Sequence, residues 1–338
     1  MLIQPTTYRS DRMRIVITGG CGFLGRRVAL KLLAEGSALG PVDELVLFDN
    51  ARSALPLPDD TRLSLVTGDI ADRATVARVI GPGTDAVFHL AAIVSGQAEA
   101  DTDLGYRVNL DGTRAVLDAC RALGTAPRLV FASSLAVYGG VLPSKIGDDT
   151  ALTPQTSYGT QKAIGELLVN DYSRKDFVDG RALRLPTVVV RPGRPNRAAS
   201  TFASSMIREP LAGQEAICPV SPDTVMALAS PRRIVAGLVH ALGIPGEAFG
   251  TSRSLQLPGF SVSVGEMAAA LRRAGGEAAY ARIRWQPDPQ IQAIVSSWPP
   301  ALATSRAEAL GFGRDKGIDE VVAAFIADDL PLQKQLVA

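Results

Sequence analysis

Short apolar runs alternate with longer amphipathic stretches along the first half of the chain. Runs of about four to eight apolar residues bounded by Gly, Asp or Ser are typical of buried parallel strands. They predict strands at 14–18, 43–50, 62–70, 85–92, 128–134 and 180–190. The stretches between them repeat their apolar positions with the period of a helix. They predict helices at 22–36, 72–80, about 102–123 and 157–175.

This alternation predicts an α/β fold, a doubly wound parallel sheet of the Rossmann type with right-handed crossovers. We expect the sheet and its helices to occupy residues 13–190, preceded by a flexible N-terminal extension at 1–12. The pattern loosens beyond this point, and residues 191–338 are expected to form a smaller region interleaved with the end of the sheet. Helices are predicted there near 202–211, 231–242 and 265–275.

Charge and cysteine content narrow the possible partners. The 338 residues carry 35 Lys or Arg and 34 Asp or Glu, for a net charge of +1, which gives no electrostatic basis for binding nucleic acid or an anionic membrane. No apolar run approaches the ~18 residues of a membrane span. Cys21, Cys120 and Cys218 lie far apart and form no CxxC pair. Neither a zinc site nor a disulfide framework is expected, and a reducing cytoplasm fits best.

Neither histidine is expected to bind a metal. His89 lies within an apolar strand and is interpreted as a core or cofactor-packing residue. The only other histidine, His240, lies in a distant predicted helix. Two histidines so far apart do not have the spacing of a metal site, so no metal is predicted.

The segment TGGCGFLG (18–25) places Gly19, Gly22 and Gly25 between the first strand and the first helix. In a dinucleotide-binding fold the first glycine permits a tight turn and the second lets backbone N–H groups approach a pyrophosphate. The third lets the helix pack on the strand. Because the motif opens the first βα unit, it predicts that residues 13–190 form a dinucleotide-binding domain.

Acidic residues at two later strand ends refine the cofactor. Asp49 ends the second strand, where a carboxylate accepts a hydrogen bond from a ribose 2′-hydroxyl and repels a 2′-phosphate. NAD is therefore favoured, although the nearby Arg52 leaves NADP open. Asp69 ends the third strand and is interpreted as a partner of the adenine amino group or as an ordinary turn residue.

Tyr158 and Lys162, in the segment Y-G-T-Q-K, lie one turn apart on a predicted helix, with Cβ atoms about 6 Å apart. A tyrosine hydroxyl ordinarily has a pKa near 10. We expect the ammonium of Lys162 and a positive nicotinamide to lower the pKa of Tyr158, so that the phenol can act as a base. Ser134 follows the fifth strand and can hydrogen-bond a substrate oxygen beside Tyr158.

Together these motifs resemble the extended short-chain dehydrogenase/reductase family. Further matches are GDI (68–70), HLAA (89–92), VNLDGT (108–113), SSLAVYGG (133–140) and the C-terminal segment 296–312. The resemblance implies that Ser134, Tyr158 and Lys162 are catalytic and that residues 191–338 bind substrate. The residues that it places on the cofactor side are Gly19, Gly22, Phe23, Leu24, Gly25, Asp49, Asp69, Ile70, Ala91, Asn109, Tyr158, Lys162 and Pro186.

Two departures from the family pattern bear on the reaction. Dehydratases of this family carry Thr-Asp-Glu where this chain has Ser-Leu-Ala at 134–136, so water elimination lacks an obvious base. Nucleotide-sugar epimerases of the family carry an Asn where this chain has Thr187, followed by Tyr-Gly where this chain has valines. A nucleotide-sugar substrate is therefore in doubt.

Arginines accumulate after the sixth strand. Arg191, Arg194 and Arg197 follow it directly, and Arg232 and Arg233 follow a Ser-Pro pair. A guanidinium fork matches a carboxylate in a bidentate manner, as a small hydroxy acid would require. A sugar diphosphate could use the same side chains, so the arginines alone do not decide between these substrates.

The strings HLAAIVSGQAE and LRLPTVVVRPGRPN are similar to those of family members that oxidise the C2 hydroxyl of a four-carbon sugar acid with NAD. We therefore expect a dehydrogenase acting on a small hydroxy acid. An NAD-dependent nucleotide-sugar epimerase and a non-enzymatic NAD-binding sensor are the alternatives, although a sensor needs no Ser–Tyr–Lys set. The expected substrate contacts are Ser95, Ser133, Ser134, Tyr158, Thr187, Arg191, Arg197 and Arg232.

The resemblance also implies a homodimer. Family members commonly pair through the helices that fall here at about 102–123 and 157–175. Leu167, Leu168 and Val169 are the candidates for an apolar outward face, although the sequence does not separate them from residues that face the sheet.

Overall fold

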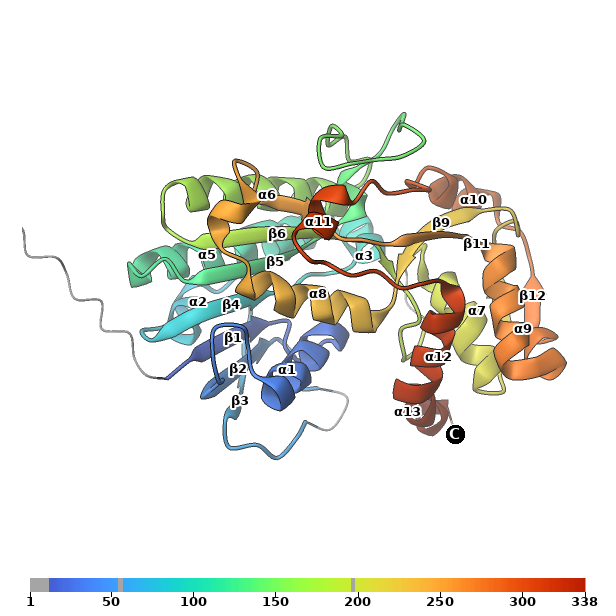
Figure 1. Ribbon diagram of the computed structural model, residues 1–338, viewed down its shortest axis with the longest axis horizontal. Helices are drawn as coiled ribbons and strands as arrows, with labels where there is room; N and C mark the ends of the chain where they lie inside the picture. Colours follow the sequence, from blue (N-terminus) through green and yellow to red (C-terminus); the bar gives the residue numbers. More distant parts are fainter. Residues whose placement is uncertain (1–11, 54–56, 196–197, 338) are drawn as a thin grey trace, which may run out of the picture.

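The computed structural model describes residues 12–53, 57–195 and 198–337. A sheet of seven parallel strands, in the order β10-β6-β5-β4-β1-β2-β3, forms its centre (Figure 1). The strand order reverses beside β1, and ligands of such sheets bind at the carboxyl edge of that crevice. The strands are β1 (Arg14–Thr18), β2 (Glu44–Asp49), β3 (Leu63–Thr67), β4 (Thr84–His89), β5 (Arg128–Ser134), β6 (Asp179–Leu185) and β10 (Ser254–Gln256).

Helices cover both faces of the sheet. Alternation along β1 sends Ile15 and Ile17 into one apolar core and Val16 into another, because successive strand side chains point to opposite faces. The first core is closed by α1 (Phe23–Glu35) and α8 (Pro231–Gly243). The second is closed mainly by α2 (Arg73–Val79), α5 (Gly112–Leu123) and α6 (Ser157–Arg174).

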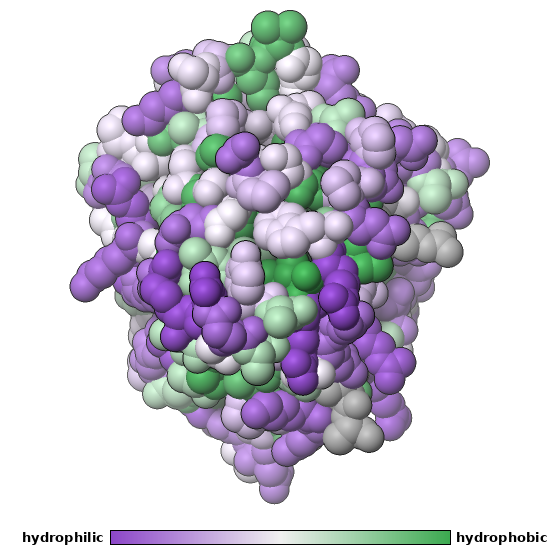
Figure 2. Space-filling model, turned by 90° about the vertical axis from the view of Figure 1, so that its right-hand side faces the viewer, coloured by the Kyte–Doolittle hydropathy of each residue, from purple (hydrophilic) through white to green (hydrophobic). Residues whose placement is uncertain are grey.

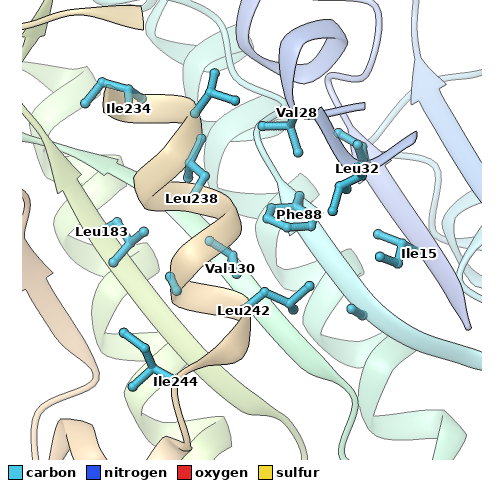
Figure 3. Packing of buried hydrophobic residues seen from close by; sticks show 14 of the residues in the cluster. Ile15, Val28, Leu32, Phe88, Val130, Leu183, Ile234, Leu238, Leu242 and Ile244 are labelled. Atoms are coloured by element: carbon cyan, nitrogen blue, oxygen red, sulfur yellow. The ribbon is translucent and has the colours of Figure 1, made fainter. Parts of the chain in front are cut away.

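Packing of α8 on the sheet has a helical period. Ile234, Leu238 and Leu242 are spaced four residues apart and point toward the strands (Figure 3). They meet Leu183 of β6 and Phe88 of β4, all almost fully buried. This apolar stripe packs a helix from beyond residue 190 against the main sheet.

The C-terminal region lies beyond the edge at which the parallel strands end (Figure 1). A three-stranded sheet, a two-stranded sheet and several helices share a separate apolar core. Its face carries mostly hydrophilic side chains with small hydrophobic groups between them (Figure 2). Its main elements are β7 (Thr187–Val188), α7 (Thr201–Leu211), β8 (Ala216–Cys218), β9 (Val225–Ala229), β11 (Phe260–Ser263), α9 (Val264–Tyr280), β12 (Ile283–Trp285), α10 (Pro289–Ser296), α12 (Ile318–Asp328) and α13 (Leu330–Val337).

Several predicted elements differ in the structure. The expected strand 180–190 is interrupted at Pro186, which has no N–H for a ladder hydrogen bond, and β7 beyond it joins the second sheet. The expected strand 85–92 ends at His89. The expected helix 102–123 is a chain of shorter pieces in which a π-helix, η1 (Tyr106–Asp111), precedes α5.

Other elements carried too little sequence signal to be predicted. The seventh strand, β10, has three residues, and α3 (Ser95–Ala100) has six. The helical geometry of α9 breaks at Gly276, next to the expected end at 275, and a second helical piece continues to Tyr280. The predicted N-terminal extension lies, apart from Arg12, outside the described residues. Within the described part of the chain, no helix combines the length and the apolar character that a membrane crossing requires.

Candidate active site

The turn between β1 and α1 fits a pyrophosphate. Gly19 has a φ of +68°, and a Cβ on Gly25 would lie 2.2 Å from the carbonyl oxygen of Gly19. No side chain caps the N-terminus of α1, and its first turn holds no acidic residue. The positive end of the α1 dipole, with the N–H groups of Phe23 and Leu24, is therefore not neutralised by an acidic residue of its own first turn. Such a helix N-terminus can bind a phosphate.

Both predicted acidic residues lie at the carboxyl edge of the sheet. Asp49 ends β2 and accepts a hydrogen bond from the N–H of Cys21 at 3.0 Å, so its carboxylate is held beside the glycine turn. Asp69 follows β3 and pairs with Arg107 of η1 at 2.5 Å. The N–H of Ala71 and the guanidinium of Arg107 lower the pKa of Asp69. Both carboxylates are therefore placed as acceptors along the expected cofactor path.

His89 is a core residue, as predicted, and it organises the cofactor side. It is 1 % exposed, and its Nδ1 lies 2.7 Å from Oγ1 of Thr18. Its Nε2 lies 2.9 Å from Oγ1 of Thr113, which itself donates to the carbonyl oxygen of Asn109. Oγ1 of Thr113 must therefore accept from Nε2–H, which assigns the neutral tautomer with Nδ1 accepting from Thr18. Oγ1 of Thr18 in turn accepts from the N–H of Ala91 at 3.3 Å.

Asn109 holds the loop after β4. Its Oδ1 accepts from the N–H of Ile93 at 2.9 Å, and its Nδ2 donates to the carbonyl oxygen of Ile93 and to Oε1 of Gln161. The side chain thus fastens this loop to α6. Ile70 packs against Gly112, where a Cβ would lie 2.9 Å from Ile70. Pro186 is buried at the break between β6 and β7.

Ser134 and Tyr158 meet at the end of β5. Ser134 ends this strand, and its side chain favours the ionised form of Tyr158, the second residue of α6. A Cβ on Gly159 would lie 2.0 Å from the carbonyl oxygen of Ala136, so only glycine lets α6 begin this close to the serine. The structure therefore brings together the two hydroxyls that the sequence predicted.

The expected lowering of the pKa of Tyr158 by Lys162 is wrong for the protein without its ligands. Burial raises the pKa of Tyr158 to about 12, and the groups that oppose this rise are Ser134 and Arg191. The Nζ of Lys162 lies 5.7 Å from the centre of the Tyr158 ring and donates to the carbonyl oxygen of Ala132 at 2.8 Å. Desolvation is the stronger effect, because Lys162 is buried and Tyr158 is partly buried.

Lys162 has a buried counter-charge that the sequence analysis missed. Burial lowers the pKa of Lys162 to about 8, and Glu166, one helical turn further along α6, opposes that shift. Glu166 is 2 % exposed and pairs with Arg184 of β6 at 2.7 Å. Its spacing of four residues from Lys162 is the one signal that could have pointed to it.

The same carboxylate engages Ser133. The Oγ of Ser133 donates to Glu166 at 2.5 Å, and Ser133 is 2 % exposed. The hydroxyl predicted to contact substrate is therefore bonded within the protein. Arg184 also donates to the hydroxyl of Tyr138 at 2.5 Å, which ties the segment after β5 to β6.

Arg191 is the predicted arginine that the structure brings to Tyr158. Burial and the charge of Arg208 lower the pKa of Arg191, and Tyr158 opposes that shift. Its N–H donates to Oγ of Ser204 at 3.1 Å, and Arg208 donates to its carbonyl oxygen at 2.6 Å. Among the described residues, no carboxylate forms an ion pair with its guanidinium. A guanidinium without a carboxylate partner is thus within electrostatic range of the candidate base.

The other arginines are placed differently. Arg194 is exposed, and Arg197 lies outside the described residues. Arg232 forms two hydrogen bonds of 2.6 Å with Asp328. It lines a cavity of about 880 Å³ between α1, α8 and the C-terminal helices, which neither Tyr158 nor Lys162 lines. The structure therefore does not bring Arg232 to the Ser134–Tyr158 pair.

Two predicted contacts lie at the ends of elements near the sheet edge. Ser95 begins α3 after β4, and Thr187 begins β7 after β6. Within the described part of the chain, no group of three or more His, Cys, Asp or Glu is arranged to hold a metal ion.

A glycine turn at the crevice of a Rossmann sheet, with a serine at the end of β5 and a tyrosine and a lysine on α6, is typical of a nicotinamide-dependent oxidoreductase. The chain belongs to the NAD dependent epimerase/dehydratase family, whose model matches residues 15–232. This membership confirms the predicted family, the fold class and NAD as the cofactor.

Relatives match along nearly the whole chain. The D-erythronate dehydrogenase of Cupriavidus necator is 53 % identical, over 94 % of this chain and 98 % of the relative. That of Haemophilus influenzae is 46 % identical, over 94 % and 100 %. A solved structure described as the nucleoside-diphosphate-sugar epimerase from Agrobacterium tumefaciens is 44 % identical, covers 95 % of both chains and has a TM-score of 0.90.

Proposed function

We propose that the protein is an NAD-dependent dehydrogenase that oxidises the C2 hydroxyl of D-erythronate to 2-oxo-erythronate. The observation that carries this proposal is the guanidinium of Arg191, which has no carboxylate partner among the described residues and interacts electrostatically with Tyr158. A hydroxy acid presents a hydroxyl and a carboxylate on neighbouring carbons, which this pair of side chains matches. The names of two relatives at 53 % and 46 % identity support the particular acid.

The chain supplies proton transfer and orientation. NAD, bound at the glycine turn, supplies the acceptor for the hydride that leaves C2. Tyr158 takes the proton of the C2 hydroxyl as the carbonyl forms, and Ser134 hydrogen-bonds the same oxygen. Arg191 binds the carboxylate. Lys162 keeps a positive charge at the cofactor side, held by its bond to the carbonyl oxygen of Ala132.

The distal hydroxyls of the acid require polar partners near this group. We assign them to Ser95 and Thr187, which begin α3 and β7 at the edge of the sheet. Both lie on segments that follow strands of the main sheet, as substrate contacts in open α/β folds do.

A nucleotide-sugar epimerase is the second candidate, favoured by the description of the structure from Agrobacterium tumefaciens. An epimerase would return its substrate without net formation of NADH. Net NADH production on a hydroxy acid therefore distinguishes the two activities.

The proposal includes the setting in which the enzyme works. We propose a cytoplasmic enzyme of carbohydrate metabolism, supported by three cysteines that are all free. We also propose a homodimer that forms through the outward faces of α5 and α6. Leu167, 66 % exposed on α6, supports this assembly.

The test is a panel of four- and five-carbon hydroxy acids with NAD and NADP, followed by the absorbance of the reduced coenzyme. D-erythronate with NAD is expected to be the best pair. Tyr158→Phe should lower kcat by a factor of about 100 or more, because general base catalysis contributes about that much, and should leave NAD binding intact. Full activity of Tyr158→Phe, or no turnover of any acid, would refute the proposal.

A further inference from the structure

The last helix of the chain reaches the loop that carries Arg191. Gln333 lies on α13 and is 1 % exposed. Its Oε1 accepts from the N–H of Gly193 at 2.7 Å, and its Nε2 donates to the carbonyl oxygen of Gly193 at 3.2 Å. The side-chain amide of Gln333 thus hydrogen-bonds both the N–H and the C=O of Gly193, which lies 140 positions earlier in the chain. Gly193 follows Arg191 by two residues and has a φ of +107°.

The loop is held from two directions. On one side, α7 holds the backbone of Arg191 through Ser204 and through the buried Arg208, which is itself paired with Glu209 at 2.6 Å. On the other side, Gln333 holds Gly193. Because the loop is held on both sides, the guanidinium of Arg191 can adopt fewer orientations. This restriction favours the binding of a planar carboxylate.

The start of α13 is tied to the helix that follows the glycine turn. The carboxylate of Asp329, a residue 6 % exposed, pairs with Arg27 of α1, and its backbone carbonyl oxygen accepts from the N–H of Gln333 at 2.8 Å. The guanidinium of Arg27 also lies 5.0 Å from the centre of the Phe23 ring in the first turn of α1. The C-terminal helix therefore contacts the cofactor helix and the Arg191 loop at once.

We propose that Gln333 is a positioning residue for substrate, which fixes the Arg191 loop so that the guanidinium meets the carboxylate of the acid. This inference rests on the proposed function. It assigns the C-terminal helix to substrate recognition, although its residues lie far from the Ser–Tyr–Lys motifs in the sequence. Gln333 does not touch the reacting atoms, so its removal should weaken binding of the acid and leave the chemical step and NAD binding unchanged.

The test compares Gln333→Met with Gln335→Met, an exposed position on the same helix. Gln333→Met keeps the length of the side chain and loses both hydrogen bonds to Gly193. The KM for D-erythronate should rise about tenfold, as expected for the loss of one to two buried hydrogen bonds. The kcat and the KM for NAD should stay close to those of Gln335→Met. Preference for the acid over its methyl ester should fall, because only the acid needs an aligned guanidinium.

Two results overturn this inference. One is an unchanged KM and ester discrimination in Gln333→Met, and the other is a parallel loss of kcat, NAD binding and Tm, which indicates a purely structural role. If Gln333→Met does not fold, Gln333→Asn keeps the neutral amide but shortens its reach to Gly193, and a smaller rise in the KM is expected. Arg191→Gln is measured alongside. An unchanged KM in that variant refutes the carboxylate clamp of the proposed function, whereas a raised KM there with an unaffected Gln333→Met refutes only this inference.

Discussion

At the scale of single residues, burial dominates the protonation of the candidate site. Tyr158 has its pKa raised to about 12 and Lys162 has its pKa lowered to about 8, and burial is the largest cause in both. At neutral pH the phenol is therefore protonated before ligands arrive. Ser134 and Arg191 already favour the phenolate, and a positive charge bound nearby adds to them. Under the proposed function NAD would supply that charge, whereas Tyr158 is protonated in the chain without it.

His89 gives a pH dependence that can be measured apart from activity. Burial, followed by the charge of Lys162, lowers the pKa of His89 from 6.5 to about 3. The folded state thus keeps this ring neutral while the unfolded state takes up a proton below pH 6.5. The stability that it contributes is complete above that pH and is lost as the pH falls toward 3. Between pH 7 and pH 5 the loss should be about 2 kcal/mol.

Urea unfolding at pH 7 and pH 5 checks this expectation by comparing the wild-type protein with His89→Gln. The variant should lose about 2 kcal/mol less between the two pH values, because its side chain does not titrate. Equal losses would show that His89 does not link folding to pH. Other titrating groups are common to both proteins and cancel in the comparison.

At the scale of elements, the sequence predicts what is local. The glycine turn, the tyrosine and lysine one turn apart on α6, and the serine that ends β5 all follow from patterns within a few residues. The break between β6 and β7 at Pro186 could have been predicted, because proline has no N–H to donate to a neighbouring strand. The pairs Glu166–Arg184 and Gln333–Gly193 could not be predicted from the sequence. Each pair joins two separate elements, and no sequence motif marks the residues that make the contact. The pKa of Tyr158 depends on burial, which no spacing of residues reveals.

The Glu166–Arg184 pair joins α6 to β6 beneath the candidate site. Glu166→Met alone should destabilise the fold by about 3–5 kcal/mol, because it leaves the guanidinium of Arg184 buried without its partner. The double variant Glu166→Met/Arg184→Met should recover much of that loss. Urea unfolding of the single and double variants measures both effects. The exposed Arg174–Asp171 pair of the same helix is the control, and Arg174→Met should change stability little. A single variant as stable as the wild type would contradict the assigned role.

At the scale of the whole molecule, segments from the second half of the chain complete the site by packing against elements of the first half. α8 and β10 rejoin the sheet after the chain has left it, and α13 reaches both the cofactor helix and the Arg191 loop. Residues at the two ends of the chain therefore define one crevice. The paired arginines Arg27 and Arg232 contribute to that closure, since both contact Asp328. Because Arg232 is paired with Asp328, it is not available to the substrate, although the sequence suggested that it would be.

The outward face of α6 carries the remaining prediction at this scale. Val169 is fully buried against the sheet and Leu168 is partly buried, so Leu167, at 66 % exposed, is the one of the three predicted leucine and valine side chains that points outward. Light scattering should give a mass near twice 35.5 kDa. Leu167→Asp should shift the protein toward the monomer, because a charge buried in an apolar interface is costly. Ile294→Asp on α10, 47 % exposed and far from α6 along the chain, should leave the mass unchanged. A monomeric wild-type protein, or a dimer that survives Leu167→Asp intact, would place assembly elsewhere than on this helix.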